Sequence, residues 1–244
     1  MIGKLKLLGI IAVLAISTAA NATIVTVYND FDGGLTNFNN TVTAAGGTAT
    51  HDTWSTQLSG TSSNQGDYTV TMNDGSAISS YIYTLWSSSP SRTTSGYVVD
   101  IDPAGSGPGI GAIGSGVTLT FDSAVNAIGF EVGDWATCCQ PSNIYISFDD
   151  AAPILVGAST VFGDGFLTNG GAGVFVAAFD DSGDFTKVQF WGDGFGEVLN
   201  MGGTIHYALL EQGSLPPSGV PAPAPLALMA IGLLGLTWRG RKAS

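Results

Sequence analysis

Basic side chains are scarce in this chain of 244 residues, which has seven lysines and arginines against 19 aspartates and glutamates. Five of those seven lie near the two ends, so the region from residue 23 to 217 has two basic side chains against 19 acidic ones, a net charge of −17. A domain of this charge repels nucleic acid and anionic membranes, which excludes nucleic-acid binding. It attracts divalent cations, and its acidity also keeps an exported protein soluble.

Cysteine and histidine are almost absent, with only Cys138, Cys139, His51 and His206. Adjacent cysteines rarely bridge each other, because the short ring strains the disulfide geometry. Three interpretations stay open: two free thiols, a strained vicinal disulfide, or a link to another chain. A structural zinc site needs more ligands than two histidines supply.

Catalytic motifs are missing as well. No serine lies in a G-x-S-x-G elbow, and neither histidine has a catalytic motif around it. Glu131, Glu197 and Glu211 could pair in space for glycoside cleavage, but their sequence context gives no support. The sequence therefore predicts a protein that is not an enzyme.

The first 22 residues have the three parts of a secretory signal peptide. Lys4 and Lys6 form a basic start, residues 7–16 an apolar helix, and Ala20 to Ala22 a small-residue cleavage site. The mature chain is expected to begin at Thr23.

The other end has a Pro/Ala hinge, an apolar stretch and a basic terminus. The apolar stretch, residues 226–238, is shorter than the roughly 20 residues that span a bilayer as a helix. A short apolar helix that anchors the chain only transiently is therefore expected, and a permanent membrane anchor is the alternative. The residues of this motif are Val220, Pro221, Pro223, Arg239 and Arg241.

Residues 218–244 resemble the PEP-CTERM sorting signal of Gram-negative bacteria that make exopolysaccharide, with Ala222 where the family usually has Glu. The resemblance implies a transient stay in the inner membrane. It also implies that an exosortase-type enzyme removes the tail and hands the protein to the cell surface or the extracellular polysaccharide.

Residues 23–217 are predicted to form one domain, an all-β antiparallel sandwich of the jelly-roll kind. Short runs of β-branched and aromatic residues alternate with polar ones, which predicts strands with one buried and one wet face. Many such strands between turns favour a sandwich. The expected strands are 23–28, 68–72, 78–86, 96–101, 117–121, 127–132, 144–148, 154–156, 173–179, 187–191 and 204–210.

No helical period is found between the two termini, and residues 30–64 are interpreted as a polar loop. A second loop, rich in Gly and Pro, is expected at residues 102–116. Long loops at the end of a sandwich are common places for binding sites.

The second half of this domain resembles the lectin-like β-sandwich ectodomains of PEP-CTERM proteins. The resemblance depends on residues 118–125, 128–130 and 192–196. It implies no catalytic residue.

Calcium is the cofactor that the acidic turns favour, because carboxylates at alternate positions can direct several oxygens at one cation. Asp30 and Asp32 form one candidate turn, and Asp180 with Asp184 another. Asp193 with Glu197 is a third. The alternative is that these residues serve local backbone hydrogen bonds in turns.

Carbohydrate contact is the next candidate, because an exposed tryptophan can stack on a sugar ring. Trp135 lies in a predicted loop, and Trp54 and Trp86 flank polar segments. The alternative for each is a place in the core.

These observations together predict an exported, non-catalytic binding or matrix protein that associates with extracellular polysaccharide. A secreted polysaccharide hydrolase and a purely structural surface protein are the two alternatives.

Overall fold

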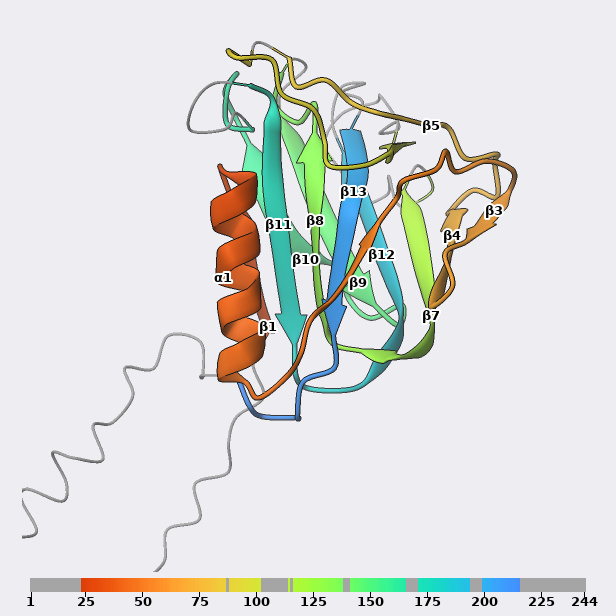
Figure 1. Ribbon diagram of the computed structural model, residues 1–244, viewed down its shortest axis with the longest axis vertical. Coiled ribbons are helices and arrows are strands. Elements are labelled where there is room, and N and C mark those ends of the chain that lie inside the picture. The colour runs from red at the N-terminus through yellow and green to blue at the C-terminus, as the bar shows by residue number, and fades with distance from the viewer. Residues whose placement is uncertain are drawn as a thin grey trace, which may run out of the picture.

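The computed structural model describes residues 23–86, 88–101, 114, 116–137, 141–165, 171–193 and 199–215. The described residues form two antiparallel sheets and one helix (Figure 1). This confirms the predicted all-β, jelly-roll-like sandwich. The signal-peptide residues 1–22 and the sorting residues 218–244 lie outside the described ranges.

One sheet has seven strands in the order β1-β11-β8-β13-β6-β5, with β2 paired to β13 as well. Its strands are β1 (Thr23–Tyr28), β2 (Thr50–Thr53), β5 (Ser80–Tyr81), β6 (Val98–Ile101), β8 (Ala127–Gly133), β11 (Gly173–Asp180) and β13 (Leu199–Ala208).

The other sheet has six strands in the order β10-β9-β12-β7-β4-β3. Its strands are β3 (Ser62–Asn64), β4 (Tyr68–Met72), β7 (Val117–Val125), β9 (Ser142–Phe148), β10 (Ile154–Ser159) and β12 (Phe185–Asp193).

The main core lies between the sheets, where the alternating patterns place their apolar residues. On β4, Tyr68, Val70 and Met72 are buried while the two threonines between them are partly exposed. β4 pairs with β7 from Tyr68↔Phe121 to Met72↔Val117, so the buried residues of the two strands lie side by side. Burial of each large inward side chain removes apolar surface from water and stabilises the fold by roughly 1.5–3 kcal/mol.

Helix α1 (Phe31–Ala44) corrects the prediction that the region between the termini has no helix and that residues 30–64 form a loop. Its glycines, asparagines and threonines favour helix weakly, so packing must stabilise it. The helix lies against the outer face of the seven-stranded sheet, beside β11 and β1 (Figure 1). Gly34, Phe38 and Val42, spaced four residues apart, form its buried face.

The contact is close at two points. Phe38 stacks on Phe179 with ring centroids 5.2 Å apart. A Cβ at Gly34 would come within 2.5 Å of the Phe175 side chain, so only glycine allows the helix to approach this closely. No helix within the described ranges is long and apolar enough to cross a membrane.

Candidate functional site

Two of the three tryptophans predicted to contact sugar lie in the core. Trp54 is 1% exposed and donates a hydrogen bond of 2.7 Å from Nε1 to the Tyr68 hydroxyl. Trp135 is 3% exposed and donates to the Ser142 carbonyl. Neither ring offers a face to solvent, so their predicted stacking role is wrong, and the alternative of core packing holds.

Trp86 remains exposed, as carbohydrate stacking requires. Half of its surface is accessible, and its ring meets that of Phe162, itself 56% exposed, in a T-shaped contact with centroids 5.6 Å apart. The Ala172 amide donates to the Trp86 carbonyl, which places this aromatic pair at the start of β11.

The acidic turns predicted to bind calcium use their carboxylates locally. Asp30 is the N-cap of α1, and its Oδ2 accepts a 3.0 Å hydrogen bond from the Gly33 amide. Asp180 Oδ1 accepts from the amide and hydroxyl of Ser182. These are the local turn contacts that the alternative interpretation expected.

Asp32 lies on the exposed side of α1, with its Oδ2 3.9 Å from Arg92 Nη2, and Asp184 is exposed in the turn before β12. Among the residues that the structure describes, no three carboxylate, histidine or cysteine side chains come together to hold a metal ion. Calcium binding at these turns stays a prediction.

Several other predicted residues lie outside the described ranges. They are the cysteines Cys138 and Cys139, the side chain of Asp193, Glu197, and the sorting residues Val220, Pro221, Pro223, Arg239 and Arg241.

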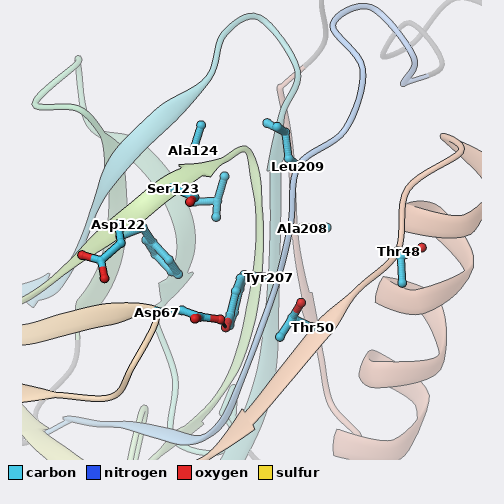
Figure 2. A pocket seen from close by; sticks show the side chains of 11 residues that line it. Thr48, Thr50, Asp67, Asp122, Ser123, Ala124, Tyr207, Ala208 and Leu209 are labelled. Atoms are coloured by element: carbon cyan, nitrogen blue, oxygen red, sulfur yellow. Dashed lines mark hydrogen bonds between the residues drawn. The ribbon is translucent and has the colours of Figure 1, made fainter.

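A pocket of about 250 Å³ opens between the two sheets. Asp67, from the turn before β4, and Asp122, Ser123 and Ala124 of β7 line it from the six-stranded side. The other side is lined by Thr48, by Thr50 of β2, and by residues 207–209 at and just after the end of β13. Figure 2 shows Asp67 and Tyr207 meeting, with Thr50 beside them. We call this the inter-sheet pocket.

An irregularity in β7 exposes the polar rim of the inter-sheet pocket. β7 pairs with β12 at Thr120↔Lys187 and again at Val125↔Phe185, so residues 121–124 stand opposite a single residue of β12. A bulge of this kind bends the strand and turns side chains away from the ladder. Asp122 and Ser123 are consequently exposed at the pocket.

Aromatic side chains form the floor of this pocket. Tyr207 is buried, and its ring lies 5.1 Å from that of Phe121 and 5.8 Å from that of Tyr68. The Tyr207 hydroxyl donates a 2.7 Å hydrogen bond to Asp67 Oδ2. Burial raises the pKa of the Tyr207 hydroxyl, and the hydrogen bond to Asp67 raises it further, so this phenol stays a neutral donor.

A second recess, of about 130 Å³, lies between the first turns of α1 and the outer face of the seven-stranded sheet. We call it the helix cleft. Its polar lining comprises Asp32, Ser95, Glu131, Thr204 and His206. Glu131 is 7% exposed, and its Oε2 accepts a 2.8 Å hydrogen bond from the Ser95 amide.

The two titratable groups buried in the helix cleft have shifted pKa values. Burial raises the pKa of the Glu131 carboxyl against the lowering effect of its hydrogen bond from Ser95, and the charge of Asp32 adds to the rise. Burial lowers the pKa of His206 to about 4, and the charge of the neighbouring His51 makes a smaller contribution in the same direction. Burial therefore shifts the protonation equilibrium of each group toward its neutral form.

Sequence reasoning missed most of the inter-sheet pocket. Asp67 and Tyr207 are 140 residues apart, and only the pairing of the strands brings them together. The predicted strand 117–121 ends just before Asp122, and no local signal marks the bulge at which Asp122 reaches the pocket.

The chain is weakly similar in structure to a few known proteins, and no similarity in sequence was found. No protein-family model matches the chain, and no curated protein matches its sequence. A family 29 carbohydrate-binding module matches with 11% identity and a TM-score of 0.34, over 71% of this chain and 99% of that one.

Two enzymes match over smaller parts of their length. An exo-β-1,3-galactanase from Phanerochaete chrysosporium has 13% identity and a TM-score of 0.23 over 57% of this chain and 32% of that chain. The catalytic unit of a family 87 α-1,3-glucanase from Streptomyces thermodiastaticus has 11% identity and a TM-score of 0.26, over 64% of this chain and 28% of that chain.

Proposed function

We propose that this domain binds a neutral saccharide, without cleaving it, in the inter-sheet pocket. The observation that carries the proposal is the grouping of two carboxylates, Asp67 and Asp122, with the hydroxyls of Thr48, Thr50 and Ser123 above an aromatic floor. Carboxylates accept strong, charge-assisted hydrogen bonds from sugar hydroxyls. Threonine and serine can donate or accept, and the Tyr207 and Phe121 rings supply the apolar contact.

The size and charge of the pocket narrow the ligand class. About 250 Å³ is slightly below the ~300–1,000 Å³ typical of sites for drug-sized ligands, so one sugar ring or a chain end fits best. No basic side chain lines the pocket among the described residues. Two carboxylates at the rim repel an acidic sugar, so neutral sugars are favoured over uronic acids.

The exposure of the carboxylates favours binding over hydrolysis. A glycosidase needs one carboxylic acid held protonated by a desolvated environment, beside a second that is ionised. Asp67 and Asp122 are both exposed. A hydrolase remains the second candidate, because paired carboxylates in one pocket are what such an enzyme uses.

The proposal places this domain outside the cell. The signal-peptide pattern of residues 1–22 and the PEP-CTERM-like tail support export, transient membrane association and handover to the surface by an exosortase-type enzyme. Intact-mass measurement of protein from the producing cells tests this. The expected species begins at Thr23 and lacks residues after about 225, whereas a species that retains residues 226–242 contradicts the sorting step.

Affinity electrophoresis through gels that contain neutral polysaccharides tests the binding function. The wild-type protein is expected to be retarded by at least one neutral polymer and not by a polyuronate. Asp122→Asn is expected to weaken that retardation about tenfold, as for the loss of one charge-assisted hydrogen bond. Asp184→Asn is the matched control, since it makes the same change at an exposed carboxylate outside the pocket.

Two results would contradict this proposal. Equal retardation of wild type and Asp122→Asn would remove the inter-sheet pocket from the binding site. Release of reducing ends from a retained polymer, abolished by Asp67→Asn or Asp122→Asn, would show hydrolysis and favour the second candidate.

A further inference from the structure

The chain has only two histidines, 155 residues apart, and the fold brings them into contact. His51 on β2 is the direct cross-strand partner of His206 on β13. Their Nδ1 atoms are 2.5 Å apart, and the ring centroids are 4.8 Å apart at a 70° angle. The two nitrogen atoms thus face each other across one pair of antiparallel strands.

The environment fixes one ring and leaves the other accessible. His206 is 4% exposed, and its ring contacts the Phe38 and Phe175 rings with centroids 6.0 and 5.6 Å away. His51 is exposed to solvent. A buried, oriented imidazole beside an exposed one gives a preformed pair that a dissolved ion can reach.

Two neutral imidazoles whose nitrogens face each other have two possible arrangements. One ring can donate an N–H···N hydrogen bond to the other, or both can direct lone pairs at a shared cation. Ligation requires neutral rings.

We propose that His51 and His206 form an open binding site for a divalent transition-metal ion of the Cu²⁺, Ni²⁺ and Zn²⁺ class. Imidazole nitrogen suits these ions, whereas Ca²⁺ and Mg²⁺ prefer oxygen. Water fills the remaining coordination positions. The strongly acidic domain raises the local concentration of cations around the pair.

Only a small movement is needed to admit the ion. Metal–nitrogen bonds are about 2.0–2.1 Å long, so two nitrogens on one ion lie about 3 Å apart. The pair has to open by roughly half an ångström from its 2.5 Å separation. A rotation of the exposed His51 ring supplies this without disturbing His206.

Titration of the full-length protein with CuCl₂, NiCl₂, ZnCl₂ and CaCl₂ at pH 7.5 tests the site. Cys138 and Cys139 are first replaced by serine, because thiols bind the same metals. One Cu²⁺ is expected to bind per chain, with imidazole nitrogen couplings in its electron paramagnetic resonance spectrum. Cu²⁺ is expected to bind more tightly than Ni²⁺ or Zn²⁺, and Ca²⁺ not to compete.

The decisive variant is His51→Gln. The glutamine amide can still donate a hydrogen bond to His206 Nδ1, so the fold is expected to persist, as an unchanged melting temperature without metal would verify. Cu²⁺ affinity is expected to fall at least about tenfold. Loss of a residue that only hydrogen-bonds to a metal ligand already has an effect of that size, and His51 is proposed to bind the metal directly. Ser55→Gln, an exposed position just after β2, is the matched control and keeps the wild-type affinity.

Three outcomes would overturn the proposal. One is Cu²⁺ affinity that is unchanged in His51→Gln. Another is a copper spectrum that shows oxygen ligands alone. The last is the absence of saturable binding at millimolar metal, which would leave the pair as an N–H···N hydrogen bond.

Discussion

Tyr207 and Asp67 tie the two sheets of the sandwich together at the inter-sheet pocket. The hydroxyl of Tyr207, on β13 of the seven-stranded sheet, donates a 2.7 Å hydrogen bond to the Oδ2 of Asp67, in the turn before β4 of the six-stranded sheet. The contact holds a carboxylate of the proposed saccharide site against the aromatic floor.

Tyr207→Phe removes this tie and keeps the ring. We expect the free energy of unfolding to fall by about 1–2 kcal/mol. This loss is small for a hydrogen bond to a charged group, because Asp67 is exposed and its carboxylate can bind water instead. Urea unfolding measures the loss. Saccharide retention is expected to fall in parallel, and an unchanged stability would mean that Asp67 is not held by Tyr207 in solution.

Replacing tryptophans by alanine should distinguish the exposed Trp86–Phe162 pair from the buried core by the loss of stability. Trp135→Ala empties a buried site and is expected to cost about 3–5 kcal/mol. Trp86→Ala removes a half-exposed ring and is expected to cost less than about 1 kcal/mol. Thermal melting of both variants makes the comparison.

Binding assays on Trp86→Ala address the remaining stacking candidate. Trp86 lies at the start of β11, whereas the inter-sheet pocket lies at the end of β13, which is the opposite end of the sheet. Loss of saccharide retention in Trp86→Ala, with full retention in Asp122→Asn, would move the binding site to the Trp86–Phe162 pair.

Asp30→Ala tests whether the first acidic turn serves the helix or calcium. Loss of the N-cap is expected to cost about 1 kcal/mol, equally with calcium and with chelator. Asp30→Asn, which can still cap, is the matched control. A stability loss that appears only in calcium would instead support the predicted metal site.

Acid should destabilise the fold through His206. Its pKa is 6.5 in the unfolded chain and about 4 when folded, because of burial and the adjacent His51, so the unfolded state takes up the proton first. Stability therefore falls as the pH drops from about 6.5 to 4 and the loss levels off below that. The full shift corresponds to about 3 kcal/mol.

His206→Gln should remove this part of the pH dependence, as urea unfolding between pH 4 and 7.5 would show. Glu131, in the same cleft, acts in the opposite direction, because its raised pKa makes folding more favourable as the carboxyl takes up a proton. Glu131→Gln is accordingly expected to stabilise the protein at pH 7.5. A His206→Gln profile that matches wild type would show that other groups govern acid unfolding.

The strands could be predicted from the sequence where one face is buried and one is wet. β4 has the predicted bounds, because the alternation in Tyr68–Met72 directly reports burial. β1 also has its predicted bounds, although its residues are mostly half-buried without alternation. β2 and β3 are short and mostly exposed, so their residues carry no such pattern. Pairing with β13 and β4 makes them strands, and that is a property of the folded chain.

The helix and the candidate sites depend on contacts between distant residues. α1 has a weak helical composition and is stabilised by packing on Phe175 and Phe179, which lie more than 130 positions later. The inter-sheet pocket and the histidine pair likewise depend on strand register. Local patterns indicate which side chains are buried, but not which distant side chains they meet.

The position of β13 determines when the domain can fold. β13 spans residues 199–208, near the end of the described chain, yet it lies inside its sheet and pairs with β8, β6 and β2. The seven-stranded sheet therefore cannot close until almost the whole domain has been synthesised, and pairings of such long range form slowly. A chain released before Leu199 would leave β8 and β6 with open edges, which invite pairing with other chains. Synthesis through β13 is thus needed to cover these edges as well as to complete the two proposed sites.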